Sequence, residues 1–108
     1  MGADGLLGAF EEQVLLAVIR TAGEAYGMEV RREIERTSER DVAIGAVYAT
    51  LDRLEAKGLV TSARPRSDPS RRIFTITRGG LSSLAATRAV RERLWHGVNL
   101  ARLGTEPR

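Results

Sequence analysis

Arginine side chains gather between positions 64 and 78, in a segment that also holds two prolines. The run RPRSDPSRR at 64–72 contains four arginines and one aspartate. Like charges crowded into a short loop repel one another, and approaching phosphates relieve that repulsion. We therefore predict that the loop contacts a phosphate backbone through Arg66, Arg71 and Arg72, with a solvated loop as the alternative.

The chain just before this loop has the spacing of a helix with two unlike faces. Its apolar side chains recur at three- and four-residue steps from position 44 to position 54. Glycine and alanine on the opposite face would let the helix backbone approach base edges, and alanine methyl groups can contact thymine. The predicted DNA contacts of this helix are Gly45, Ala46, Tyr48, Ala49, Thr50, Arg53 and Lys57.

Several of these helix positions have a second interpretation. Tyr48 lies at the edge of the apolar side, so packing against the preceding helix and contact with a phosphate are both open. Arg53 and Lys57 are also ordinary residues for a solvated helix face, although the neighbouring arginine loop favours contact with DNA. Asp52 counts against such contact, because a carboxylate repels phosphate.

The elements that position these residues follow from the same kind of pattern. Apolar spacing predicts one helix over about 7–19 and a second over about 25–38. Gly58 follows a lysine as a left-handed cap that ends the third helix, and β-branched and aromatic residues predict strands from Leu59 and over 72–77. Three helices followed by two strands predict a mainly α fold with a small β-wing, a winged helix-turn-helix.

A further amphipathic helix is predicted at the C-terminal end, over about 81–103 with Thr77 as its N-cap. A terminal helix has little of its own domain to pack against, and two-fold contacts are the commonest way for a protein to cover such a face. We therefore predict a homodimer formed by this helix and the first one. The predicted interface residues are Leu84, Val90, Leu94, Trp95 and Val98.

The same tail sets the predicted domain boundary. Residues 1–78 would form the winged helix-turn-helix, and residues 79–108 the C-terminal dimerisation helix and a short tail. Thr87 and Arg91 interrupt the apolar face of that helix. Gly97 marks either a close crossing of two helices or the end of the helix.

Composition excludes several classes of protein. A chain of 108 residues with 43% hydrophobic and 29% charged residues supports one globular domain. It has no cysteine, which excludes disulfides and zinc sites of the usual Cys/His type, and its single histidine lacks matching partners for a His-based triad. We therefore predict no enzymatic activity, cofactor or metal. No apolar run approaches the roughly 20 residues that span a bilayer, and the N-terminus resembles no leader, which predicts a cytoplasmic protein.

Four blocks of sequence, taken in order, resemble the PadR family of bacterial transcription regulators. They are EEQVLLAVI, EAYGMEVRREIE, GAVYATLDRLEAKGLV and SRRIFTITRGG, and they cover residues from about 8 to 80. The resemblance is to the short-tailed type with one C-terminal helix. It implies a dimeric winged-helix repressor whose third helix enters the major groove and whose wing lies along the adjacent backbone or minor groove. The tyrosine that often touches the DNA backbone in the family corresponds to Tyr48, and its basic pair to Arg71 and Arg72.

The chain departs from the family pattern in two places. Ala43 stands where many members have a Ser or Thr N-cap, which removes about 1 kcal/mol of helix stability unless Asp41 substitutes. Asp68, Pro69 and Ser70 replace a glycine-rich wing, which predicts a stiffer wing. Some members bind flat apolar effectors between facing aromatics of the last helix, so Trp95 is either a dimer anchor or an effector contact.

The sequence thus predicts a homodimeric repressor that binds a pseudo-palindromic site in double-stranded DNA. Relief of repression by a small-molecule effector at the dimer interface stays open. The alternative is a protein-interaction module whose basic wing binds an acidic partner. RNA binding is less favoured, because the predicted strands carry no aromatic platform.

Overall fold

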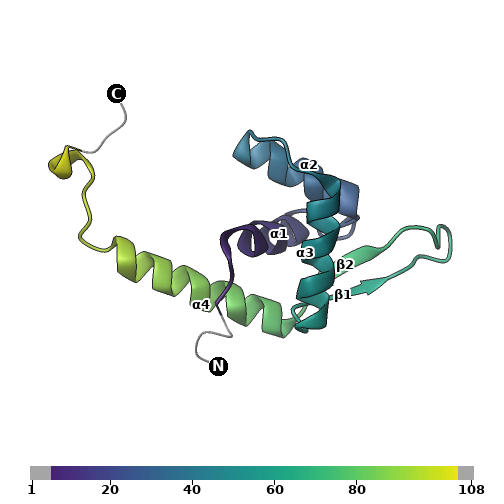
Figure 1. Cartoon of the computed structure of the whole chain (residues 1–108). Coiled ribbons are helices and arrows are strands. Elements are labelled where there is room, and N and C mark those ends of the chain that lie inside the picture. Colours follow the sequence, from purple (N-terminus) through teal and green to yellow (C-terminus); the bar gives the residue numbers. More distant parts are fainter. Residues whose placement is uncertain (1–5, 105–108) are drawn as a thin grey trace.

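The computed structural model describes residues 6–104. Three helices come first, α1 (Ala9–Arg20), α2 (Gly27–Ser38) and α3 (Ile44–Ala56). Two short strands, β1 (Val60–Ala63) and β2 (Ile73–Ile76), precede α4 (Arg78–Trp95) and a one-turn 3-10 helix (Ala101–Leu103). Figure 1 shows α1, α2 and α3 gathered into a compact body, with the hairpin projecting from one end and α4 leaving toward the other. This arrangement confirms the predicted winged helix-turn-helix with a C-terminal helix.

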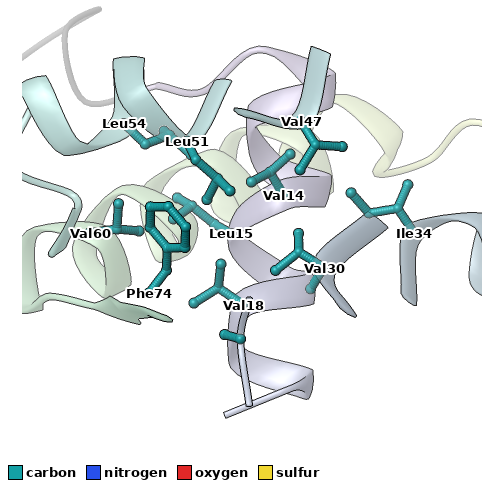
Figure 2. Packing of buried hydrophobic residues seen from close by; sticks show 12 residues of the cluster. Val14, Leu15, Val18, Val30, Ile34, Val47, Leu51, Leu54, Val60 and Phe74 are labelled. Carbon is teal, nitrogen blue, oxygen red and sulfur yellow. The ribbon is translucent and has the colours of Figure 1, made fainter. Parts of the chain in front are cut away.

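The apolar faces predicted from spacing meet in one core. Phe74 of β2 lies among side chains from α1, α3 and β1 (Figure 2), and it is 1% exposed. The other fully buried large side chains come from all three helices and from β1: Val14, Leu15, Val30, Val47, Leu51, Leu54 and Val60. Their burial fixes which side of α3 faces inward and leaves the opposite side free.

The two strands form an antiparallel pair in which Val60 is opposite Ile76 and Ala63 is opposite Ile73. A third segment joins the sheet, because the Phe74 N–H group donates to the Ala25 carbonyl oxygen at 2.9 Å. The base of the wing is thereby anchored to the turn between α1 and α2.

Hydrogen bonds fold the wing tip back on itself. The Asp68 N–H group donates to the Pro65 carbonyl at 3.1 Å, and the Arg71 N–H group donates to the Asp68 carbonyl at 3.1 Å. The Arg64 guanidinium closes the loop by donating to the Pro69 carbonyl at 3.1 Å. Two successive turns and one cross-loop bond fit the stiffness predicted for the Asp-Pro-Ser segment.

Caps explain where α3 begins and ends. Gly58 has φ = 77° directly after the helix, which confirms the left-handed cap. At the other end Ala43 is the N-cap, and no side chain bonds to the first turn. Asp41 therefore does not substitute for the missing N-cap.

The C-terminal helix is shorter than predicted. Thr77 caps it as expected, since its hydroxyl oxygen accepts a bond from the Gly80 N–H group at 3.1 Å. The helix ends at Trp95, because Gly97 adopts φ = 78° and turns the chain away. The apolar spacing up to about position 103 therefore overstated the length of the helix, whereas the alternative that the helix ends at Gly97 is confirmed. Val98 lies beyond the helix end rather than on its face.

The middle of α4 is fastened to the N-terminal part of the chain by the two residues that interrupt its apolar face. The Leu7 N–H group donates to the Thr87 hydroxyl at 3.0 Å, and Arg91 forms an ion pair with Glu12. Leu84 was predicted to lie at the dimer interface, but its side chain packs partly against the core of its own domain. Within residues 6–104, no helix is long and apolar enough to cross a membrane.

Candidate nucleic-acid interface

The outward face of α3 carries small, exposed residues. Gly45, Ala46 and Ala49 are all exposed, as the apolar spacing predicted. A Cβ atom added to Gly45 would meet no heavy atom within 4 Å, and its φ is not positive. Glycine near the start of a helix reduces stability by about 1 kcal/mol relative to alanine. Neither internal packing nor backbone conformation requires Gly45, which points to close approach by something outside the domain.

Tyr48 is positioned both to pack and to reach outward. A Cβ atom on Gly27, the first residue of α2, would lie 2.3 Å from Tyr48 Cζ, so the phenol ring covers that glycine. The tyrosine nevertheless remains 36% exposed. The packing interpretation is therefore correct, and a phosphate contact by the hydroxyl remains compatible with the exposed part of the ring.

Thr50, which was predicted to contact DNA, is buried inside the domain. It is 3% exposed, and its hydroxyl accepts a bond from the Arg53 guanidinium at 3.3 Å. Its position explains this burial, because Thr50 lies three residues after Val47 and four before Leu54, on the inward side of the helix.

Arg53 and Lys57 are both tied to one carboxylate of α1. Glu11 Oε2 lies 2.9 Å from Lys57 Nζ and 3.5 Å from Arg53 Nε, while Glu11 Oε1 accepts the Gly8 N–H group at 2.9 Å. Burial alone would raise the pKa of Glu11, but Lys57, Gly8 and Arg53 together lower that pKa below its usual value. The two cations remain about half exposed, so one negative charge partly offsets two positive ones.

Two wing arginines are available at the surface. Arg66 is exposed and forms no ion pair with any described residue. The Arg71 guanidinium stacks 3.7 Å from the centre of the Tyr26 ring, at the start of α2, and lies 3.9 Å from Asp68. Stacking on an aromatic ring restricts a guanidinium while leaving its edge free to donate hydrogen bonds.

Arg72 is held differently from the other wing arginines. Its two terminal nitrogens lie 2.9 Å from Asp52 Oδ1 and 2.8 Å from Glu55 Oε1, and its side chain is only 23% exposed. Burial alone would lower the pKa of Arg72, but the two carboxylates raise that pKa above its ordinary value. The expectation that Arg72 is unpaired was therefore wrong, because two carboxylates of α3 already bind it.

Sequence reasoning missed three residues that shape this surface, namely Glu11, Asp52 as an ion-pair partner, and Glu55. The spacing of Asp52 and Glu55, three apart on one helix face, was the available signal for a shared cation. Arg40, in the turn before α3, was also passed over; it is exposed and unpaired within the described part of the chain.

A second exposed surface lies at the far end of the molecule. Leu94 is 74% exposed and Trp95 54% exposed, and these two side chains line a shallow hollow with Val98 and Leu100. Leu16 and Ile19 of α1 and Leu81 of α4 are also partly exposed. Ile19 and Leu81 border an apolar groove between α1, β2 and the start of α4.

Comparison with known proteins agrees with this geometry. The sequence profile of the transcriptional regulator PadR-like family matches residues 15–86. The chain is similar to RosR of H. salinarum in crystals grown from NaBr, with 25% identity, a TM-score of 0.70, and 89% of this chain and 84% of that chain covered. No curated protein matches the chain.

Two other similar structures show the fold. One is Bordetella bronchiseptica BpsR, whose DNA binding is regulated by 6-hydroxynicotinic acid; it has 21% identity and a TM-score of 0.66, with 91% of this chain and 73% of that chain covered. The other is the apo form of wild-type MarR from E. coli, with 22% identity and a TM-score of 0.61, covering 92% of this chain and 72% of that chain.

Proposed function

Because the chain belongs to the PadR-like family of transcriptional regulators, we propose that it is a homodimeric repressor of a pseudo-palindromic site in double-stranded DNA. In this proposal α3 enters the major groove and the wing follows the neighbouring backbone. The proposal rests on the exposed face formed by Gly45, Ala46 and Ala49, because neither packing nor backbone conformation within the domain requires a glycine at position 45. The protein would act in the cytoplasm and without enzymatic activity.

In this proposal the side chains of α3 and of the wing have different roles in DNA binding. The small face of α3 allows close approach to bases but offers few groups with a base preference, so DNA shape would contribute to specificity. Arg66 and Arg71 would supply phosphate contacts, with Tyr48 at the edge. Arg53 and Lys57 would contribute less, because Glu11 already offsets part of their charge.

Arg66→Ala and Arg71→Ala are each expected to reduce the salt dependence of DNA affinity. A cation that contacts one phosphate releases about 0.9 counterion, so each substitution should flatten the slope of log K against log salt by about one unit. Fluorescence anisotropy with a labelled duplex of about 30 base pairs, titrated at several salt concentrations, measures this slope. Slopes equal to that of the wild type would show that these two arginines do not contact phosphates.

The proposed dimer uses the apolar end of α4. Figure 1 shows α4 pointing away from the body formed by α1, α2 and α3, and Leu94 and Trp95 at the end of this helix remain uncovered. The groove bordered by Ile19 and Leu81 offers a second copy a complementary apolar surface that includes α1. A two-fold dimer would place two α3 helices about 34 to 36 Å apart, or a multiple of that spacing, to reach half-sites on one side of the duplex.

Leu94→Glu is expected to dissociate the dimer at micromolar concentration. A charge buried at an apolar interface is strongly unfavourable, which weakens self-association by at least about 100-fold. Sedimentation equilibrium measures the effect. Ser82→Glu is the matched control, because Ser82 is exposed and helical spacing places it on the side of the same helix away from Leu81, Leu94 and Trp95. Equal dissociation constants for the two variants would contradict this interface.

Trp95 would anchor this dimer. The alternative role for Trp95 is contact with an effector. A titration of its fluorescence with planar cationic compounds distinguishes the two roles. A saturable change in emission supports an effector, whereas unchanged emission across the panel supports the dimer anchor only.

The protein-interaction alternative predicts no binding to duplex DNA at moderate salt in a mobility-shift assay.

A further inference from the structure

One guanidinium joins the recognition helix to the wing. Arg72 immediately precedes β2, and its two terminal nitrogens bond to Asp52 at 2.9 Å and to Glu55 at 2.8 Å in the last turns of α3. Asp52 and Glu55 lie three residues apart on one helix face, so a forked guanidinium can bond to both at once. A lysine ammonium has no such fork.

The first strand takes part in the same cluster. The Ser62 hydroxyl of β1 lies 2.9 Å from Glu55 Oε2 and 3.1 Å from Glu55 Oε1. The Arg72 guanidinium carbon also lies 4.8 Å from the centre of the Phe74 ring, which is part of the core. Both strands of the wing are therefore fastened to the end of α3 by side chains, in addition to the short backbone ladder.

The charges of the cluster argue against a phosphate contact by Arg72. One positive charge faces two carboxylates, so the group of three carries a net negative charge. The donors that point to Asp52 and Glu55 are already used, and the side chain is mostly buried. Earlier in the loop, Arg66 forms no ion pair with any described residue, and Arg71 stacks on Tyr26 with its exposed edge free to donate.

We propose that Arg72 is a positioning residue for DNA binding, which sets the angle between the wing and α3 by bridging Asp52 and Glu55. This inference rests on the proposed function, because the angle matters only when helix and wing contact one duplex together. Simple electrostatics makes the opposite prediction for the acidic pair: removing two carboxylates near DNA, and freeing Arg72, should strengthen binding.

The double variant Asp52→Ala/Glu55→Ala tests the two accounts by the sign of its effect. The bridge predicts that affinity for a labelled duplex falls about tenfold, although the protein has become more positive, and that the slope of log K against log salt does not become steeper than that of the wild type. Tighter binding with a steeper slope would overturn the proposal and make Arg72 a phosphate ligand. The duplex is selected by the wild-type protein from a random-sequence pool.

Two further variants separate position from charge and from folding. Arg72→Lys keeps the charge but replaces the two bonded nitrogens by one, which weakens the bridge, so it should lose part of the affinity that the double variant loses; wild-type affinity would contradict the bridge. Glu29→Ala/Glu92→Ala removes two acids from the surface ion pairs with Arg32 and Arg88, and should keep or raise affinity. Thermal unfolding of each variant confirms that the protein is folded at the assay temperature.

Amide hydrogen exchange gives a readout that does not need DNA. Loss of the bridge should speed exchange at 64–72 at least about tenfold, while α1 and α2 keep wild-type rates. Unchanged exchange across the wing would overturn the proposal. If the wild-type protein binds no duplex at all, the proposed function fails, and the exchange result still decides whether the bridge orders the wing.

Discussion

Ala49→Glu is expected to weaken binding to duplex DNA by at least about 100-fold without destabilising the protein. Ala49 is exposed on the outward face of α3, so a glutamate there is solvated in the free protein and keeps good helix propensity. In the complex its carboxylate would face base edges and phosphates at close range. A like charge placed in such an interface is unfavourable by several kcal/mol, and about 1.4 kcal/mol corresponds to each tenfold loss.

Two measurements made together identify the cause of the loss. Mobility shift or anisotropy gives the affinity, and urea unfolding gives the free energy of unfolding, which should stay within about 0.5 kcal/mol of the wild type. Ser82→Glu, at an exposed position of α4 on the side away from Leu94 and Trp95, adds the same charge outside α3 and should change affinity by less than about threefold. Equal affinities for Ala49→Glu and the wild type would show that this face of α3 does not contact DNA.

Gly80→Ala is expected to reduce the free energy of unfolding by about 2 to 3 kcal/mol or more. A Cβ atom at this position would lie 2.3 Å from the Leu59 carbonyl oxygen and 2.5 Å from Ile76 Cγ1. The first of these atoms belongs to the backbone and cannot swing aside, so the start of α4 must move away from the base of the wing. For a domain of this size, stabilised by roughly 5 to 15 kcal/mol, the loss is a large fraction of the total.

The neighbouring glycine is the matched control. At Gly79 an added Cβ would lie 3.4 Å from the Gly58 carbonyl oxygen, which is ordinary contact, and alanine favours a helix over glycine by about 1 kcal/mol. Gly79→Ala should therefore be neutral or stabilising by a few tenths of a kcal/mol. Urea unfolding compares the two variants, and a Gly80→Ala protein as stable as Gly79→Ala would contradict the close packing between α4 and the wing.

Most of the fold could be predicted because it depends on local patterns. The spacing of apolar residues predicted the first three helices to within a few residues, and Gly58 marked the end of α3 through a backbone conformation that glycine adopts easily. Thr77 was recognisable as a cap because a hydroxyl directly before a helix satisfies its first N–H groups. Each of these signals lies within a few residues of the feature it predicts.

The errors arose where partners distant in sequence decide the outcome. Arg72 looked free because Asp52 and Glu55 precede it by 20 and 17 residues, across the hairpin. The cations Arg53 and Lys57 looked free because Glu11 lies in α1. Composition shows how many charges a surface carries, but only the packing of α1, α3 and β2 shows which of them neutralise one another.

Two errors were local, and the sequence held the signal for both. The hydroxyl of Thr50 suggested a phosphate contact. Its spacing from Val47 and Leu54, however, already placed Thr50 on the inward side of α3, where it is buried. The last helix was extended past Gly97 because apolar residues continue beyond it, although a glycine can end a helix in the left-handed conformation seen here.

Hydroxyl-radical cleavage of a selected duplex tests the central claim most directly. The wild-type protein selects its sites from a random-sequence pool, and cleavage of the bound DNA then maps the protected backbone. A dimer that uses α3 and the wing should protect two tracts related by a two-fold axis, with centres about 34 to 36 Å apart or a multiple of it, and Ala49→Glu should abolish both. A pool that shows no enrichment, or protection that Ala49→Glu leaves unchanged, would contradict the account.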